Sequence, residues 1–149
     1  MMFCKVLLCS ATLSLLAVSV ESGGGSTSTF SYDLSGPALT ALYNKKVYLA
    51  EVMRRPLGNL PVAVGIISHC GVRVTLDDGS KWLVHKGDGY GISSQTVVTD
   101  ARHMSSNWRV ISSKNFGGTR TVSGLVTAGG PNYRLFGDNC HNACENITN

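Results

Sequence analysis

The most informative stretch of the chain lies near its C-terminus and reads Tyr133-Arg134-Leu135-Phe136-Gly137-Asp138-Asn139-Cys140-His141-Asn142-Ala143-Cys144. It predicts a short strand that passes through a Gly-Asp turn into a helix whose first turn carries Cys140. Backbone N–H groups at the start of a helix are unpaired and carry partial positive charge, which favours a thiolate there. Because the thiolate is the nucleophilic form of cysteine, the pattern indicates a reactive cysteine.

Two histidines that could serve such a cysteine lie far upstream, at His69 and His85, each in a strand-like run. A lone cysteine with remote histidines is typical of a cysteine nucleophile and its general base. A cysteine hydrolase or acyltransferase is therefore the leading interpretation.

The segments that carry the two histidines predict a β-hairpin over residues 70–86, with its turn at Asp77-Asp78-Gly79. A three-residue loop with glycine at its left-handed position is a common hairpin connection. It would pair Gly71 with His85, and since side chains alternate along a strand, His69 would then lie diagonally from His85 on the same face. A two-residue loop would place the histidines on opposite faces.

The rest of the pattern predicts an α+β domain. A helix is expected over residues 37–53, and strands are expected over 61–68, 70–76, 80–86, 96–98, 108–111, 120–126 and 132–136. The expected architecture is an antiparallel sheet of about five strands, with an N-terminal helix and a C-terminal helix that carries the nucleophile.

The N-terminal residues 1–20 have the pattern of a secretory signal peptide, with Lys5 followed by an apolar run and small residues at the cleavage site. The run is too short to span a membrane, and no later stretch has the ~20 apolar residues needed. The alternative is a buried N-terminal helix. We expect a secreted protein with a signal peptide at 1–20, a flexible leader at 21–36, one domain at 37–149 and no transmembrane segment. Asn146 begins a glycosylation acceptor sequence, which is consistent with export.

Export would leave three cysteines in the mature chain: Cys70, Cys140 and Cys144. An odd number in a secreted protein suggests a free reactive thiol or an intermolecular bridge. A Cys70–Cys144 disulfide would leave Cys140 free, as catalysis requires, whereas a disulfide at Cys140 would rule catalysis out. Cys70 faces away from His69 in a regular strand, so this bridge needs the helix to reach the other sheet face or a local twist.

The charge balance limits the partners of the protein. Thirteen Lys and Arg residues against nine Asp and Glu residues give a net charge of +4. The basic residues are scattered, without a basic run or interleaved aromatics, which argues against nucleic-acid binding. Weak attraction to anionic cell surfaces fits better. His69, His85 and Cys140 are residue types that zinc accepts, but no paired metal-binding motif accompanies them, so no metal and no cofactor are expected. His103 is predicted to be a loop-surface residue.

In the order of these residues, the chain resembles the lecithin–retinol acyltransferase-like family. That family belongs, with the NlpC-type peptidases, to the broader papain-like group, and its catalytic segments follow one another in a circularly permuted order. The matching segments are Ser68–Val74, Trp82–His85, and Tyr133–Leu135 through Asn139-Cys140, within residues 62 to 146. The resemblance implies a permuted papain-like fold.

The resemblance also implies roles for individual residues. Cys140 would be the nucleophile, His69 its base, and His85 the residue that orients that base. Asn139 and the backbone N–H groups near the helix start would support the oxyanion. His141 is an alternative base, although neighbouring side chains on a helix point apart.

The substrate implied is a peptide amide or a lipid ester that acylates the cysteine. The family commonly has Glu-His-Phe after the cysteine, where this chain has His141-Asn142-Ala143, and the chain lacks the hydrophobic C-terminal anchor of the membrane-bound acyltransferases. These departures argue against retinoid or phospholipid chemistry, while secretion, the cationic surface and the missing anchor favour amide hydrolysis. The competing hypothesis is a non-catalytic, disulfide-stabilised, secreted binding module on the same fold.

Overall fold

The computed structural model describes residues 33–34, 36–63, 65, 67–87, 96–134 and 136–149. The predicted signal peptide and most of the predicted leader lie outside these residues, and both stay predictions. Within the described residues, no helix is both long and apolar enough to cross a membrane.

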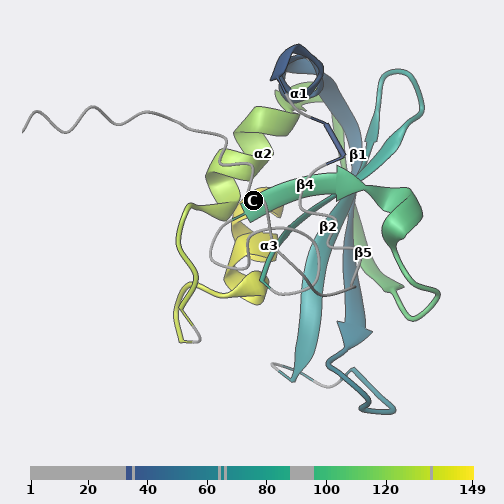
Figure 1. Cartoon of the computed structure of the whole chain (residues 1–149), viewed down its shortest axis with the longest axis vertical. Coiled ribbons are helices and arrows are strands. Elements are labelled where there is room, and N and C mark those ends of the chain that lie inside the picture. The colour runs from purple at the N-terminus through teal and green to yellow at the C-terminus, as the bar shows by residue number, and fades with distance from the viewer. Residues whose placement is uncertain (1–32, 35, 64, 66, 88–95, 135) are drawn as a thin grey trace, which may run out of the picture.

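A five-stranded antiparallel sheet forms the centre of the described part (Figure 1). The elements in chain order are α1 (Gly36–Asn44), β1 (Lys46–Pro56), β2 (Ser68–Leu76), β3 (Lys81–Lys86), β4 (Thr96–Asp100), the 3₁₀ turn η1 (Ala101–His103), β5 (Arg109–Thr121), α2 (Val122–Gly129) and α3 (Cys140–Thr148). The strand order is β4-β3-β2-β1-β5, so β2 is the middle strand. The predicted α+β class with a five-stranded antiparallel sheet is confirmed.

The helix predicted over residues 37–53 is half wrong, because α1 ends at Asn44 and the chain continues as strand β1. Val47 and Tyr48, which are β-branched and aromatic, favour an extended backbone. The strand lies between β2 and β5, where Val47, Ala50 and Met53 become buried. Pairing with two distant strands therefore overrides the helix-like spacing of the apolar residues.

Three further predicted strands, over 120–126, 132–136 and 61–68, are wrong in whole or in part. Residues 122–126 belong to helix α2, which begins after Thr121, whose side-chain oxygen accepts a hydrogen bond from the Gly124 N–H. Such a cap stabilises the start of a helix. In place of a strand at 132–136, the described residues form an isolated bridge between Arg134 and Asp138. In the range 61–68, where a strand is predicted, the described residues before Ser68 precede β2, which begins at Ser68.

The two faces of the sheet are covered differently. Helices α2 and α3 lie against one face (Figure 1) and pack with the even-numbered residues Cys70, Val72 and Val74 of β2. The other face carries a smaller cluster of Met53, Leu83, Trp108 and Met104. Because side chains alternate along a strand, Cys70 and His69 belong to different faces.

Candidate active site

The β2–β3 hairpin brings His69 and His85 together. Gly79 has a φ of +79°, and its N–H donates to the Leu76 carbonyl over 3.1 Å. The resulting three-residue loop pairs Gly71 with His85, as predicted. His69 Nε2 then lies 3.2 Å from His85 Nδ1, and both rings are buried. The prediction that the histidines share one face is confirmed.

The His69 ring is enclosed by Trp108 and by the end of β3. The ring centroids of His69 and Trp108 are 5.4 Å apart in an edge-on arrangement. The opposite edge of the imidazole faces Gly87, since a Cβ on Gly87 would lie 3.3 Å from His69 Cε1 and 3.7 Å from Nδ1. Nε2 therefore faces His85, while the Nδ1–Cε1 edge points towards the residues that follow β3.

Burial lowers the pKa of His69 from 6.5 to about 2, and the positive charges of His85, Arg55 and His141 act in the same direction. The imidazole is therefore neutral in the folded protein, because protonation would place a charge where water cannot reach it. A neutral imidazole can accept a proton.

This pKa predicts that the protein loses stability in mild acid. Between about pH 7 and pH 5 the unfolded chain protonates His69, with its ordinary pKa of 6.5, while the folded chain does not. As the pH is lowered over this interval, the free energy of unfolding therefore falls by about 2 kcal/mol. Urea unfolding of the wild type and His69→Gln at both pH values measures this term. Equal acid losses in the two proteins would contradict the prediction.

Cys140 is the first residue of α3, and Asn139 caps this helix. The Asn139 side-chain oxygen accepts hydrogen bonds from the N–H groups of His141 and Asn142, at 2.9 and 3.2 Å. In return, the Asn142 side chain accepts from the Asn139 N–H at 3.2 Å. This capping box satisfies first-turn donors. Because two of the N–H groups expected to support an oxyanion are occupied by the cap, Asn139 serves to define the helix start.

The Cys140 thiol is free and buried, and it lies against the start of β2. Its Sγ is 3.9 Å from the carbonyl oxygen of Ser68, the residue directly before His69. His141 reaches the same carbonyl oxygen, 3.0 Å from its Nε2. The expectation that neighbouring helix side chains point apart is therefore wrong here, because both side chains converge on one backbone atom.

The predicted Cys70–Cys144 disulfide is present, with Cα atoms 6.5 Å apart. It holds α3 on the sheet face that carries Cys70, opposite the face of the histidines. The contacts thus bring Cys140 to the start of β2, beside the backbone that leads into His69. Asn146 is exposed on α3, and its glycosylation stays a prediction.

Tyr133 lies near the His69 edge at Gly87, and sequence reasoning missed its position. A Cβ on Gly87 would lie 3.4 Å from Tyr133 Cε2, close to the edge of His69. Burial and the negative charge of a Cys140 thiolate raise the pKa of Tyr133. Tyr133 is therefore near both groups. The only sequence signal was its place in the stretch that precedes Cys140.

A buried ion pair connects the end of β3 to the turn before α3. Lys86, which follows His85, is fully buried, and its Nζ lies 2.5 Å from Asp138 Oδ1. A buried ammonium requires such a partner because its desolvation is costly. The pair ties the histidine-bearing strand to the segment that carries Cys140. Sequence reasoning missed it because the partners are 52 residues apart.

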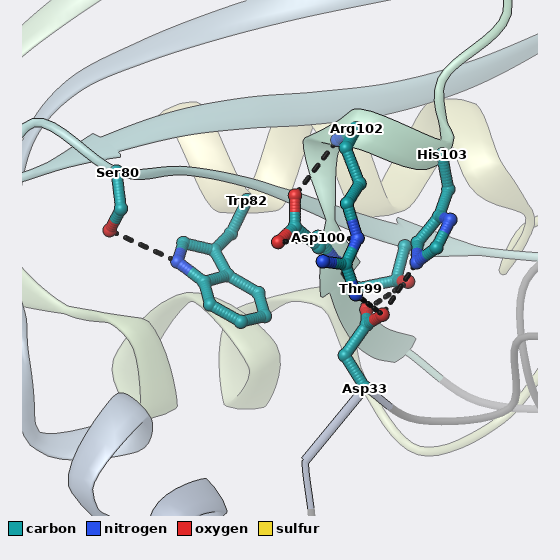
Figure 2. Close-up of polar contacts among 7 residues, drawn as sticks. All are labelled: Asp33, Ser80, Trp82, Thr99, Asp100, Arg102 and His103. Atoms are coloured by element: carbon teal, nitrogen blue, oxygen red, sulfur yellow. Dashed lines mark hydrogen bonds and ion pairs between the residues drawn. The ribbon is translucent and has the colours of Figure 1, made fainter.

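A second polar cluster forms around Asp33 (Figure 2). The carboxylate accepts hydrogen bonds from the Asp100 N–H at 2.5 Å and the Thr99 hydroxyl at 2.7 Å, and lies 2.5 Å from His103 Nε2. Burial alone would raise the pKa of Asp33, but these hydrogen bonds lower it overall. The interpretation of His103 as a loop-surface residue is wrong, because its side chain packs against Asp33. Asp33 anchors the chain before α1 to β4 and η1.

Within the described residues, no group of three or more His, Cys, Asp or Glu side chains is arranged to hold a metal ion. No protein-family model matches the chain, and no similar protein is found among curated proteins or solved structures. The site must therefore be interpreted from its own geometry.

Proposed function

We propose that the protein is a secreted cysteine hydrolase or acyltransferase with a permuted papain-like fold, acting on amide or ester acyl groups. The observation that carries the proposal is the convergence at the start of β2. There, the free thiol of Cys140 contacts the Ser68 carbonyl, and the next residue, His69, is paired with His85.

The proposed reaction begins when the Cys140 sulfur attacks the acyl carbon of the substrate. The thiol proton passes to the imidazole of His69, and the carbonyl π electrons move to oxygen. Collapse of the tetrahedral intermediate breaks the bond to the amine or alcohol, which leaves with the proton from His69. Water then hydrolyses the thioester, or a second acceptor takes the acyl group.

Burial leaves the resting imidazole of His69 neutral, as a general base requires, so it can receive a proton when the thiol attacks. Burial also makes the imidazole a weak base, so proton transfer depends on the charge that develops on the substrate. His85, 3.2 Å from Nε2, fixes the ring orientation. The resulting imidazolium is formed together with a negative charge on the substrate oxygen, which offsets part of the cost of a buried cation.

The reaction also requires Cys140 Sγ and His69 Nδ1 to approach each other around the start of β2. The Nδ1–Cε1 edge of His69 faces Gly87 and Tyr133, and Tyr133 is close enough to Cys140 to feel its charge. Tyr133 therefore lies near the side of the imidazole that His85 leaves open.

The competing function, a disulfide-stabilised binding module, is favoured by one observation. Cys140 is only 5% exposed and packs in the same apolar cluster as Cys70 and Cys144. A small buried thiol can be a structural side chain.

Thiol labelling of the native secreted protein distinguishes the two functions. We expect iodoacetamide to modify Cys140 before unfolding, with Cys70 and Cys144 recovered as one disulfide-linked peptide. Peptide mapping by mass spectrometry gives the assignment, and Cys140→Ala is the control for labelling elsewhere. A Cys140 that is modified only after unfolding, or that is recovered in a disulfide, would favour the binding module.

A further inference from the structure

Six of the large apolar side chains that remain exposed lie at one end of the sheet. Four belong to the β1–β2 connection, which projects beyond the end of the sheet in Figure 1, and two belong to the start of β5. They are between 41% and 58% exposed: Leu57, Leu60, Val62, Ile67, Val110 and Ile111. We call this set the apolar tip.

The two parts of the apolar tip are neighbours because of the strand register. Pro56 pairs with Ser68, so the connection leaves and re-enters the sheet at adjacent positions. Met53 pairs with Val110, so β5 begins at the same end. Leu60, Val62 and Ile67, with Pro61, also line a shallow apolar depression. A clustered exposed apolar surface on a small protein usually marks an interaction site.

Arginines flank the apolar tip without a compensating acid. Arg54 and Arg55 end β1, and Arg54 pairs in the sheet with Arg109. None of these three forms an ion pair with a carboxylate in the described part of the chain. The sequence has no Asp or Glu between Arg54 and Leu76, nor from 101 to 137. This end of the sheet is therefore both apolar and cationic.

We propose that the apolar tip docks on an anionic phospholipid bilayer. Apolar side chains on a projecting connection can enter the boundary between headgroups and acyl chains, while arginines behind them stay at the level of the lipid phosphates. The combination of clustered apolar side chains, unpaired arginines and missing carboxylates matches an anionic lipid surface in charge and polarity. The proposal does not depend on the chemistry of Cys140.

Vesicle co-sedimentation tests this docking surface. The probe is the purified secreted protein, with its N-terminus determined by mass spectrometry so that an uncleaved apolar leader does not contribute. Vesicles of phosphatidylcholine with about 30 mol% phosphatidylserine are compared with pure phosphatidylcholine vesicles. We expect binding to the anionic vesicles to be at least about tenfold stronger and to weaken with added salt.

Two variants separate the apolar and cationic contributions. Leu60→Asp with Ile67→Asp should weaken binding at least about tenfold, because it removes two inserted side chains. Arg54→Gln with Arg109→Gln should weaken it about 25-fold, at about fivefold for each arginine, and reduce the salt dependence. Tyr48→Ser is the matched control, since Tyr48 is equally exposed but lies near the other end of β1.

The outcomes are decisive if each variant unfolds at the same temperature as the wild type. Equal binding of the wild type and the Leu60→Asp/Ile67→Asp variant would overturn the proposal. Failure of the wild type to bind anionic vesicles would also overturn it. If, in addition, these substitutions abolish a concentration-dependent dimer, the apolar tip is a contact surface for a second copy of the chain.

Discussion

Replacing Cys140 with alanine is expected to lower acyl turnover by at least about 10³-fold, because no other side chain in the proposed site supplies the attacking atom. Cys140→Ser is expected to be nearly as inactive, since a hydroxyl is much harder to ionise than a thiol of ordinary pKa ~8.5. The rate of p-nitrophenyl butyrate hydrolysis, followed by absorbance at about 405 nm, measures this loss of turnover, which should be about 10³-fold or more.

The control for this prediction is the stability of the variants. Cys140 is buried among the residues that pack α3 on the sheet, so its side chain also contributes to the core. Removing its sulfur should cost about 1–2 kcal/mol of unfolding free energy. Cys140→Ser, which is nearly isosteric, separates loss of chemistry from loss of packing. A folded Cys140→Ser protein with wild-type turnover would exclude Cys140 as the nucleophile.

Removal of the Cys70–Cys144 disulfide has the largest expected effect on stability. The bridge closes a loop of 74 residues, and closing a loop of this length restricts the unfolded chain by about 4 kcal/mol. Cys70→Ala/Cys144→Ala should lower the unfolding temperature by about 15 °C or more. It should also release the part of α3 that carries Cys140, so turnover should fall with stability.

Thermal unfolding of the double variant, beside Cys140→Ala, measures this contribution. The matched comparison matters because Cys140→Ala removes a buried sulfur from the same cluster without opening the bridge. If the free energy of unfolding of the double variant is within about 1 kcal/mol of the wild-type value, the disulfide does not hold α3 in place.

The parts of the fold that could be predicted from sequence depend on local chemistry. The Asp77-Asp78-Gly79 turn requires a left-handed glycine, and this set the register that pairs Gly71 with His85. The Gly137-Asp138 turn before Cys140 indicated the helix start, and the structure places the Asn139 side chain as its cap. In both cases the determining contacts lie within a few residues of the sequence signal.

The parts that failed depend on distant partners. β1 is a strand because β2 and β5 flank it, and residue spacing alone could not show that pairing. Helix α2 replaces a predicted strand because its apolar residues, such as Leu125, pack with α3 on one face of the sheet. The sequence spacing of apolar residues is compatible with either element when the segment is this short.

The same distinction applies to the candidate site. The pairing of His69 with His85 could be predicted from one hairpin, and the Cys70–Cys144 bridge from the odd cysteine count. The positions of Tyr133 and His141 around the site, and the burial of Lys86 against Asp138, depend on how α3 docks on the sheet. No motif in the sequence encodes that docking.

The central claim is that Cys140 forms a thioester with His69 as its base, and intact-mass spectrometry of the acylated protein tests it most directly. After mixing with p-nitrophenyl butyrate, the account predicts one added butyryl group on the peptide that contains Cys140, removable by neutral hydroxylamine. Its formation should slow at least about 10²-fold in His69→Ala. Butyryl groups found only on lysines, or Cys140 acylated equally fast without His69, would contradict the account.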